Sequence, residues 1–316
     1  MLRRTILAAL LASALPLAAS AQEAIKIAIG QRGNWDTSVP ELGKQAGIFK
    51  KHGLELDLLY TQGGGETQQA VIAGSADIGV AAGTLGVLGA FSKGAPVRIV
   101  GAQATGASDF WYARADSKLQ SIRDAGPDTT IAYSTNGSST HSIVLGFVDA
   151  FGLKSKLVPT GGPPGTFTAV MSGQVDVGWS SPPFGLEAID GNKIRIIARA
   201  NDVPAIRDQS IRTLIANLRF IESRKPVLDK FMAAYRETLD WMYTSDDAIK
   251  AYAEFTKQTP EIAKRVRDEF FPKSLMLPDQ MFGMDALMAD AVKFKSLNQP
   301  LSAGQLKDLL RIPPRS

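Results

Sequence analysis

The sequence predicts an α/β protein built from two similar lobes, and three observations carry this prediction. First, a 27-residue segment that begins at Gly53 recurs 99 residues later at Gly152, with eleven identical positions and no gap. Second, strand-like apolar runs alternate with helical segments around both copies, which is typical of parallel sheets flanked by helices. Third, residues 203–316 lack the repeat and have a mainly helical pattern, so we expect them to pack onto the first lobe.

Each copy of the repeat predicts a strand, a turn, a helix and a second strand. Gly74 and its equivalent Gly173 can adopt the left-handed conformation that ends a helix. Pro163, Pro164 and Gly165 form the turn of the second copy. The expected elements of the first copy are a strand at residues 54–60, a turn at 61–65, a helix at 67–73 and a strand at 76–80.

A further strand and helix precede each copy. Residues 24–29 and 129–133 are the expected strands, and each is followed by a loop and a helix. With one such sheet flanked by helices, each lobe would be a small α/β sandwich. In the C-terminal segment, Pro226 suits the first turn of a helix, Thr259 caps another, and residues 302–305 form a capping box for the last helix.

Two extended stretches enclose the second copy and predict a hinge. Residues 109–115 lead into this copy, and residues 194–200 lead out of it. Two crossings between lobes permit hinge closure around a small ligand. We therefore assign residues 22–112 and 201–316 to the first lobe, and residues 113–200 to the second lobe.

The first 21 residues have the pattern of a cleaved secretory signal peptide. Arg3 and Arg4 precede an apolar run at residues 5–17, and residues 19–21 form a small-residue cleavage site. This run has 13 residues, fewer than the roughly 20 needed to span a bilayer. We therefore expect the mature chain to begin at Gln22 and to be a soluble protein of the periplasm.

Composition excludes several classes of function. The chain has no cysteine, so it has neither a disulfide framework nor the usual site of a lipid anchor. Without Arg3 and Arg4, 33 basic residues face 31 acidic ones and no basic block stands out, so nucleic acid is not an expected partner. His52 and His141 are too few for a known metal cluster, and no catalytic motif occurs. We therefore expect no enzymatic activity, no metal and no cofactor.

Ligand-binding residues are expected in the loops that follow the strands, because ligands of parallel α/β sheets bind beyond the carboxyl ends of the strands. Glycines in these loops let a ligand approach the backbone, and hydroxyl and amide groups can hydrogen-bond it. Several loops also open helices, whose free N–H groups favour an anion. The candidate ligand-binding residues are Gln31, Arg32, Asn34, Trp35, Gly64, Gly83, Thr84, Ser134, Asn136, Gly137, Ser138, Ser139, Thr140, His141, Ser180 and Ser181.

Most of these candidates also have a purely structural explanation. Residues 138–140 open a helix, where Ser and Thr are usually only caps, and residues 136–137 can be only a turn. Arg32 is either the counter-ion of an acidic ligand or a solvated loop residue. Trp35 either lines the pocket or packs in a core, and His141 either faces the cleft or does not. The sequence leaves these alternatives open.

Four segments carry a resemblance to a known family. They are AGIFKKHGLELDLLYTQGGGETQQAVIAGSADIGVA, WYARADSKLQSIRDAG, IAYSTNGSSTHSIVLGFVDAFGL and MSGQVDVGWSSPP. Together they resemble periplasmic solute-binding proteins of the nitrate, sulfonate and taurine type, and are also similar to the thiamine-pyrimidine precursor binding proteins. The resemblance covers residues 24–200 and extends loosely over the tail. It implies the type II fold of periplasmic binding proteins, with two lobes, a two-strand hinge and a helical C-terminal segment on the first lobe.

The resemblance also implies a function and a set of partners. It implies a monomer that captures a small solute, closes, and docks on the membrane permease of an ABC importer with its ATPase. Arg32 and Trp35 suggest a solute with an acidic group, such as a sulfonate or carboxylate, and an apolar body. By carry-over, the positions near the family's pocket are Gln31, Asn34, Gly83, Thr84, Ser134, Gly137, Ser138, Ser139 and Ser181.

Two other functions remain open, and one segment departs from the family. A ligand-sensing module that docks on a membrane receptor would have the same pocket. An enzyme related to thiamine-pyrimidine synthesis would have the same fold, although the type that this resembles is rich in cysteine and cytosolic. Residues 124–128 (DAGPD) differ from the family's Asp-Leu-x-Gly-Lys pattern, which leaves the conformation of this loop open.

Overall fold

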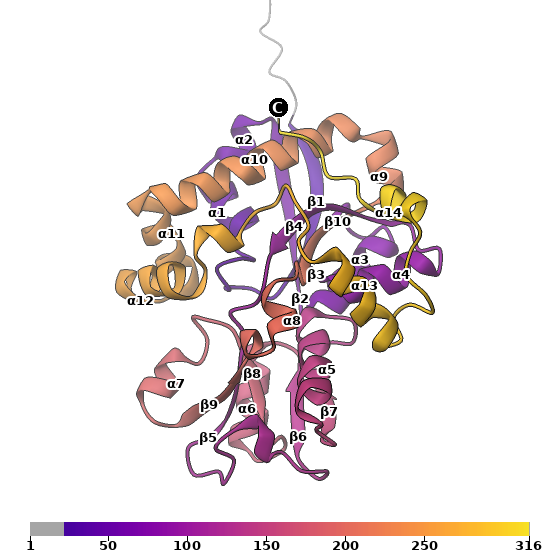
Figure 1. The fold of residues 1–316 in the computed structure, drawn as a ribbon. Coiled ribbons are helices and arrows are strands. Elements are labelled where there is room, and N and C mark those ends of the chain that lie inside the picture. Colours follow the sequence, from indigo (N-terminus) through magenta and orange to yellow (C-terminus); the bar gives the residue numbers. More distant parts are fainter. Residues whose placement is uncertain (1–21, 316) are drawn as a thin grey trace, which may run out of the picture.

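The structure is a computed structural model that describes residues 22–315. The predicted signal peptide at residues 1–21 lies outside the described residues. Figure 1 shows a larger upper lobe and a smaller lower lobe, joined by segments near the middle of the molecule. Among residues 22–315, no helix is long and apolar enough to cross a membrane.

A five-stranded sheet forms the centre of the first lobe, in the order β2-β1-β3-β10-β4. β1 pairs in parallel with β2 and β3, whereas β10 runs antiparallel to β3 and β4. The sequence predicted a sheet of the parallel type and a mainly helical segment after residue 203, so the antiparallel strand that returns from the second lobe was missed. The strands are β1 (Glu23–Gly30), β2 (Leu54–Thr61), β3 (Ile78–Gly83), β4 (Val97–Ala104) and β10 (Arg212–Asn217).

The second lobe holds two smaller sheets. Its three-stranded sheet, in the order β8-β5-β9, is antiparallel, and its two-stranded sheet pairs β6 with β7 in parallel. A parallel bridge between Ile131 and Val177 joins the two sheets. The strands are β5 (Phe110–Arg114), β6 (Thr130–Tyr133), β7 (Lys156–Pro159), β8 (Gly178–Ser180) and β9 (Ile194–Arg199).

Helices cover the sheets of both lobes (Figure 1). In the second lobe they are α5 (Ser139–Phe151), α6 (Pro163–Met171) and α7 (Leu186–Asp190). Short 3-10 turns occur at Ile122–Asp124, Ala200–Asp202 and Lys273–Leu275, and a π-helical turn occurs at Val266–Phe270. The remaining helices are α1 (Val39–Gln45), α2 (Ile48–Lys51), α3 (Gly64–Ile72), α4 (Thr84–Ser92), α8 (Pro204–Arg207), α9 (Leu218–Ser223), α10 (Lys225–Thr244), α11 (Asp246–Thr256), α12 (Pro260–Arg265), α13 (Met284–Lys293) and α14 (Ala303–Leu309).

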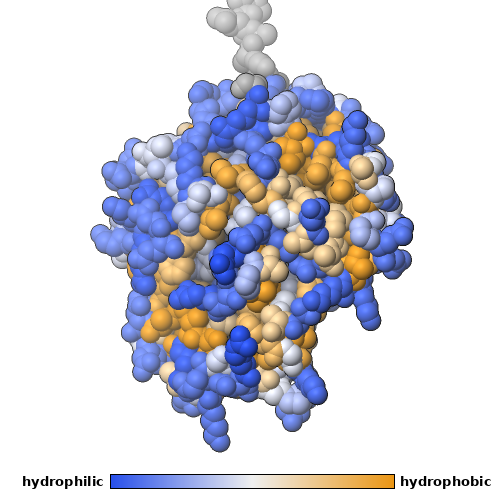
Figure 2. Space-filling view, in the orientation of Figure 1, coloured by the Kyte–Doolittle hydropathy of each residue, from blue (hydrophilic) through white to orange (hydrophobic). Residues whose placement is uncertain are grey.

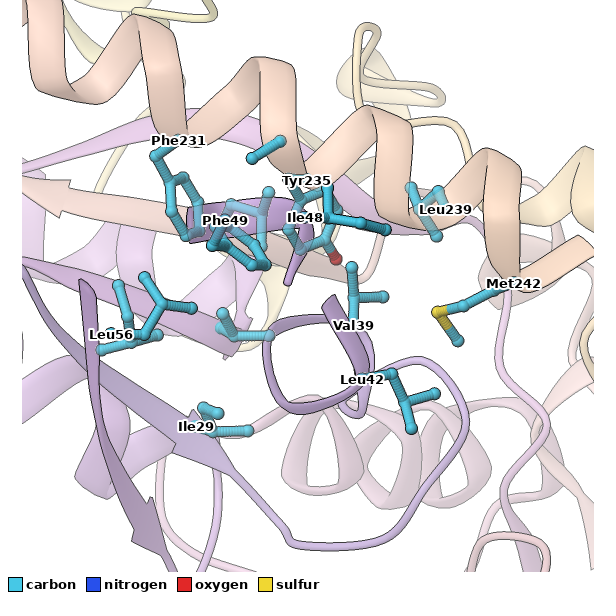
Figure 3. Close-up of a cluster of buried hydrophobic side chains, with 14 of the residues drawn as sticks. Ile29, Val39, Leu42, Ile48, Phe49, Leu56, Phe231, Tyr235, Leu239 and Met242 are labelled. Atoms are coloured by element: carbon cyan, nitrogen blue, oxygen red, sulfur yellow. The ribbon is translucent and has the colours of Figure 1, made fainter. Parts of the chain in front are cut away.

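The C-terminal segment packs on the first lobe, as predicted. Phe231, Tyr235, Leu239 and Met242 recur at helical spacing, so they form one apolar face of α10. Figure 3 shows this face against side chains of α1, α2, β1 and β2, all of which belong to one buried cluster. The capping signals of the sequence are also confirmed, because Ser302 and Gln305 form the predicted capping box at the start of α14.

The two predicted hinge stretches form the neighbouring strands β5 and β9. Both strands pack in the second hydrophobic core, which also includes residues 200–211 in part. The chain therefore crosses between the lobes just before β5 and just after β9. Gly106 N donates to Gln209 O (2.8 Å), so the two crossings lie side by side. We propose residues 105–109 and 200–211 as the crossings, slightly outside the division expected from the sequence.

The two copies of the sequence repeat also form equivalent hydrogen bonds. In the first copy, the hydroxyls of Thr61 and Thr67 lie 2.8 Å apart, and in the second copy those of Thr160 and Thr166 lie 2.6 Å apart. Thr67 and Thr166 each donate to the carbonyl oxygen four residues earlier, at the start of α3 and α6. These contacts join the start of each helix to the end of the preceding strand. Both helix starts therefore face the space between the lobes.

Candidate functional site

A small cavity of about 20 Å³ lies between the two lobes. This volume is close to the roughly 10–15 Å³ that one water requires, so the lobes are closed on each other. Its walls come from the end of β1 and the loop after it, the loop after β6, the starts of α3 and α5, and the strands β3, β8 and β10. The lining residues are Gly30, Gln31, Asn34, Thr37, Gly64, Ala81, Ser134, Ser139, Thr140, Trp179 and Arg212.

Close backbone contacts bring the lobes together around this cavity. A Cβ atom at Gly86 would lie 2.3 Å from Gly137 O, and one at Gly65 would lie 2.0 Å from Asn136 O. Any larger residue at these two positions would therefore keep the lobes apart. Gly65 N also donates to Thr135 Oγ1 across the interface (3.1 Å). We call this contact between residues 63–65 and 83–86 of the first lobe and residues 134–138 of the second lobe the interlobe seam.

Arg212, the first residue of β10, is the charged centre of the site. Its side chain is 5% exposed, and it donates to Asp36 Oδ2 (2.8 Å) and to Asp109 Oδ2. Its Nε donates to Ser139 Oγ in the second lobe (3.0 Å). Burial lowers the pKa of Arg212, but the two carboxylates more than offset this, so the net pKa is raised and the guanidinium stays charged.

Asp109 is fully buried, and its environment opposes ionisation. Burial raises its pKa above the ordinary value, Arg212 acts in the opposite direction, and the nearby Asp36 adds to the rise. The second oxygens of both carboxylates, Asp36 Oδ1 and Asp109 Oδ1, have no hydrogen-bond partner among the described residues. The positive charge of Arg212 is therefore already matched by its two neighbours and is not free for a solute.

Six of the residues predicted from the sequence line the cavity together. Asn34 is 2% exposed, and its Oδ1 atom has no partner among residues 22–315. Ser134, Ser138 and Thr140 form a cluster of hydroxyls in which each oxygen lies within 3.0 Å of the other two. The six lining residues are Gln31, Asn34, Gly64, Ser134, Ser139 and Thr140.

Other predicted residues lie around the cavity without lining it. Ser138 caps α5 by accepting from His141 N (3.2 Å), which is the structural role left open by the sequence. Gly83 and Gly137 meet in the interlobe seam. Thr84 is buried at the start of α4, and its hydroxyl donates to Ser210 O (2.6 Å). Asn136 is exposed, and its Oδ1 accepts from Tyr133 (2.6 Å).

Arg32 and Trp35 lie away from the cavity. The guanidinium of Arg32 is 4.1 Å from the centre of the Phe255 ring and is exposed to solvent. Trp35 is fully buried, its Nε1 donates to Tyr243 (3.0 Å), and its ring packs edge-on against Tyr252. Both side chains therefore pack against the helical C-terminal segment. The sequence did not reveal this, because the residues that they contact lie about 200 positions later in the chain.

The remaining predicted residues have other neighbours. His141 stacks on Tyr133, with ring centres 4.5 Å apart, and burial lowers its pKa. Ser180 donates to Phe184 O (2.8 Å) and lines a separate cavity in the second lobe. Ser181 is fully buried, and its hydroxyl has no partner among the described residues. Among residues 22–315, no group of three His, Asp or Glu side chains could hold a metal ion.

Sequence reasoning missed Arg212, Asp36, Asp109, Thr37 and Trp179. A signal for Arg212 was present, because a single arginine precedes the apolar run Thr213–Ala216 in a segment read as helical. Asp36 stands directly beside Trp35, which the sequence did select, and Asp109 is the first residue of the predicted hinge stretch at residues 109–115. Their meeting depends on the return of β10 between β3 and β4, which no local pattern encodes.

Solved structures share this architecture at low sequence identity. The alkanesulfonate-binding protein SsuA of Xanthomonas axonopodis pv. citri, bound to MOPS, has a TM-score of 0.72 and 19% identity, covering 91% of this chain and 97% of that one. The periplasmic nitrate-binding protein NrtA of Synechocystis PCC 6803 has a TM-score of 0.69 and 13% identity, covering 92% and 86%. A Candida albicans protein described as having the generic periplasmic binding protein fold has a TM-score of 0.69 and 12% identity, covering 93% and 99%. The chain therefore has the two-lobed fold of periplasmic binding proteins.

Sequence comparison identifies the family. A search of curated proteins finds no match. The model of the family described as NMT1/THI5 like matches residues 42–249, which include most of the first lobe, the whole second lobe and the start of α11. This match spans more than half of the chain, and the resemblance expected from the sequence is confirmed. The chain belongs to the NMT1/THI5-like family.

Proposed function

We propose that this protein is the solute-binding component of an ABC importer. It would work as a monomer in the periplasm, capture a small organic solute between its lobes, and deliver it to a membrane permease driven by an ATPase. The observation that carries this proposal is the cavity lined from both lobes and closed by the interlobe seam. Its size requires the lobes to part before an organic solute enters, which two adjacent crossings permit.

The similar structures support the class of solute. The proteins from Xanthomonas and Synechocystis are described as binding an alkanesulfonate and nitrate, and we propose an oxyanion, such as a sulfonate or carboxylate, for this chain as well. No free cation of the described residues lines the cavity, because Arg212 is paired with Asp36 and Asp109. The oxyanion would therefore be held by neutral donors, namely the hydroxyls of Ser134 and Thr140 and the free N–H groups that open α3 and α5.

A thermal-unfolding panel tests the capture of a solute. It would contain taurine, alkyl and aryl sulfonates, nitrate, aromatic carboxylates and pyrimidines. A solute at about 100 times its Kd adds about 2.7 kcal/mol to the free energy of unfolding. Ser139→Trp should abolish the rise in Tm, because Ser139 lines the cavity, whereas Ser172→Trp at an exposed position of the same lobe should keep it.

A matched pair of ligands tests the charge of the solute separately. Ethanesulfonate and ethanesulfonamide have nearly the same shape, but only the first is an anion. We expect the sulfonate to raise the Tm more than the sulfonamide does. The opposite order would contradict the oxyanion while leaving the capture of a solute intact, and no rise with any compound in either panel would count against capture itself.

A further inference from the structure

The second lobe contains a cavity of its own, of about 290 Å³. It lies between β5, the start of α6, the loop after β8, and α7. All of its lining residues belong to the second lobe, and one of them, Phe184, also lies against Gly33 of the first lobe, where a Cβ atom would be 3.2 Å from the Phe184 ring. We call it the lobe-two pocket, and its lining residues are Tyr112, Pro163, Pro164, Phe167, Ser180, Phe184, Gly185, Glu187, Ala188 and Lys193.

The walls of this pocket are mainly apolar and aromatic. The rings of Phe167, Phe184 and Tyr112 line it together with two prolines. Figure 2 shows apolar surface at the lower left of the molecule, where Figure 1 places α7 and β9. The volume is about twice that of an apolar cavity of about 150 Å³ that holds benzene. A flat molecule of one or two rings therefore fits, and aromatic walls favour it.

One hydroxyl donor belongs to a residue that lines the pocket. Tyr112 is 1% exposed and lines the pocket, and its hydroxyl has no hydrogen-bond partner among the described residues. Gly178 leaves room for this hydroxyl, because a Cβ atom there would lie 2.7 Å from it. Burial raises the pKa of Tyr112, so the phenol stays protonated and can donate. A ligand that places an acceptor atom against this hydroxyl would therefore gain a hydrogen bond that no described side chain supplies.

The rim of the pocket carries two opposite charges. Glu187 and Lys193 are both exposed, and neither forms an ion pair within residues 22–315. Because these charges cancel, the rim favours neither an anion nor a cation. Ser180, which the sequence singled out as a ligand residue, instead donates to Phe184 O (2.8 Å) and holds the loop that forms one wall.

We propose that the lobe-two pocket binds a neutral aromatic molecule whose ring packs among Phe167, Phe184 and Tyr112, and whose ring nitrogen or carbonyl oxygen accepts a hydrogen bond from the Tyr112 hydroxyl. This site is separate from the interlobe cavity and does not depend on the proposed import function. Its occupant need not be the transported solute.

Quinoline and naphthalene provide a matched pair of probes. They have the same two-ring shape, but only quinoline has an acceptor nitrogen. Calorimetric titration of the purified protein should show tighter binding of quinoline. Tyr112→Phe keeps the ring and removes only the donor, so it should weaken quinoline binding about three- to tenfold, the usual worth of one hydrogen bond. The same variant should leave naphthalene binding unchanged.

Two further variants separate the pocket from general apolar adsorption and from the cleft. Ala188→Trp should fill the pocket and abolish binding of both probes, whereas Ala150→Trp, at an exposed position on α5, should not. Ser139→Trp in the interlobe cavity should leave quinoline binding unchanged. The proposal is overturned if quinoline does not bind, if both probes bind equally to the unaltered protein and to Tyr112→Phe, or if binding survives Ala188→Trp.

Discussion

Arg212 Nε donates a hydrogen bond of 3.0 Å to Ser139 Oγ, and this contact joins β10 of the first lobe to the first residue of α5 in the second. The same guanidinium is paired with Asp36 after β1 and with Asp109 at the first crossing. One side chain therefore connects both lobes and a crossing. Since every donor group of Arg212 has a partner in the closed form, opening of the cleft must release at least the bond to Ser139.

Replacement of Arg212 by leucine should strongly destabilise the protein. The change would leave the buried carboxylates of Asp36 and Asp109 without a cation, and breaking a buried pair in this way costs about 3–5 kcal/mol. Urea unfolding followed by circular dichroism would measure the loss. Arg207→Leu, at an exposed position of α8, is the control and should change stability by less than about 0.5 kcal/mol. A loss at Arg212 as small as that of the control would contradict the central role of this pair.

Asp109 should make stability decrease as the pH rises. Burial first, and then the charge of Asp36, raises its pKa in the folded state above the ordinary 3.8, against the opposing effect of Arg212. The folded state then binds the proton more tightly than the unfolded chain does. The free energy of unfolding therefore falls as the pH rises from 3.8 to the raised pKa of the folded state. Asp109→Asn should remove this decline.

The pH effect is best measured as a difference between the two proteins, because several exposed carboxyls titrate in the opposite direction. The pKa values of Glu237 and Asp308, for example, are lowered by partners that hydrogen-bond their ionised forms. These groups are present in both proteins and cancel. Urea titrations of both proteins from about pH 4 to about pH 8 should therefore show a stability difference that changes with pH. A constant difference would contradict the raised pKa.

Gly86→Ala should hold the lobes apart without unfolding either of them. The added Cβ atom would lie 2.3 Å from Gly137 O, a backbone atom of the opposite lobe that cannot turn away. We expect a larger radius of gyration by small-angle X-ray scattering and weaker binding of any solute that needs closure. Gly126→Ala is the matched control, because its Cβ atom would have nothing within 4 Å. If Gly86→Ala changed neither the radius of gyration nor the solute affinity, the close contact in the interlobe seam would not control closure.

Local patterns predicted the repeat well because each contact of the repeat lies close to its own strand and helix. The helix stops at Gly74 and Gly173 both have positive φ, as predicted. Asp77 and Asp176, which are equivalent in the repeat, accept from the backbone N–H groups of Lys26 in β1 and Thr130 in β6. Equivalent residues thus made equivalent contacts, although their partners were not visible in the sequence.

The site was predictable only where its residues belong to the repeat or follow the strand that precedes each copy of it. Gln31, Asn34, Ser134 and Ser139 meet in the cavity because strand ends of both lobes face the same space. The place of Arg212 in the site could not be predicted, because this residue arrives on a strand inserted antiparallel between β3 and β4 after the chain has completed the second lobe. The burial of Trp35 depends in the same way on α10 and α11, which return to the first lobe late in the chain.

An exposed ion pair across the lobes should favour closure slightly and in a salt-dependent way. Lys293 on α13 of the first lobe is paired with Asp149 on α5 of the second, and both side chains are about half exposed. Exposed pairs contribute about 0.2–1 kcal/mol, so Lys293→Glu should shift the protein modestly toward the open form. The double variant Lys293→Glu with Asp149→Lys restores opposite charges and should restore closure. Fluorescence energy transfer between labels on the two lobes would measure the shift at low and high salt.

The control for this pair is Lys225–Asp229, an exposed pair within α10 that does not cross the lobes. Lys225→Glu introduces the same change of charge, so an effect of net charge alone would appear in both variants. We expect only Lys293→Glu to change the distance between the lobes, and we expect the change to vanish at about 1 M salt, where the Debye length is about 3 Å. A shift that persists at high salt, or that the double variant does not reverse, would mean that Lys293 acts by packing rather than by charge.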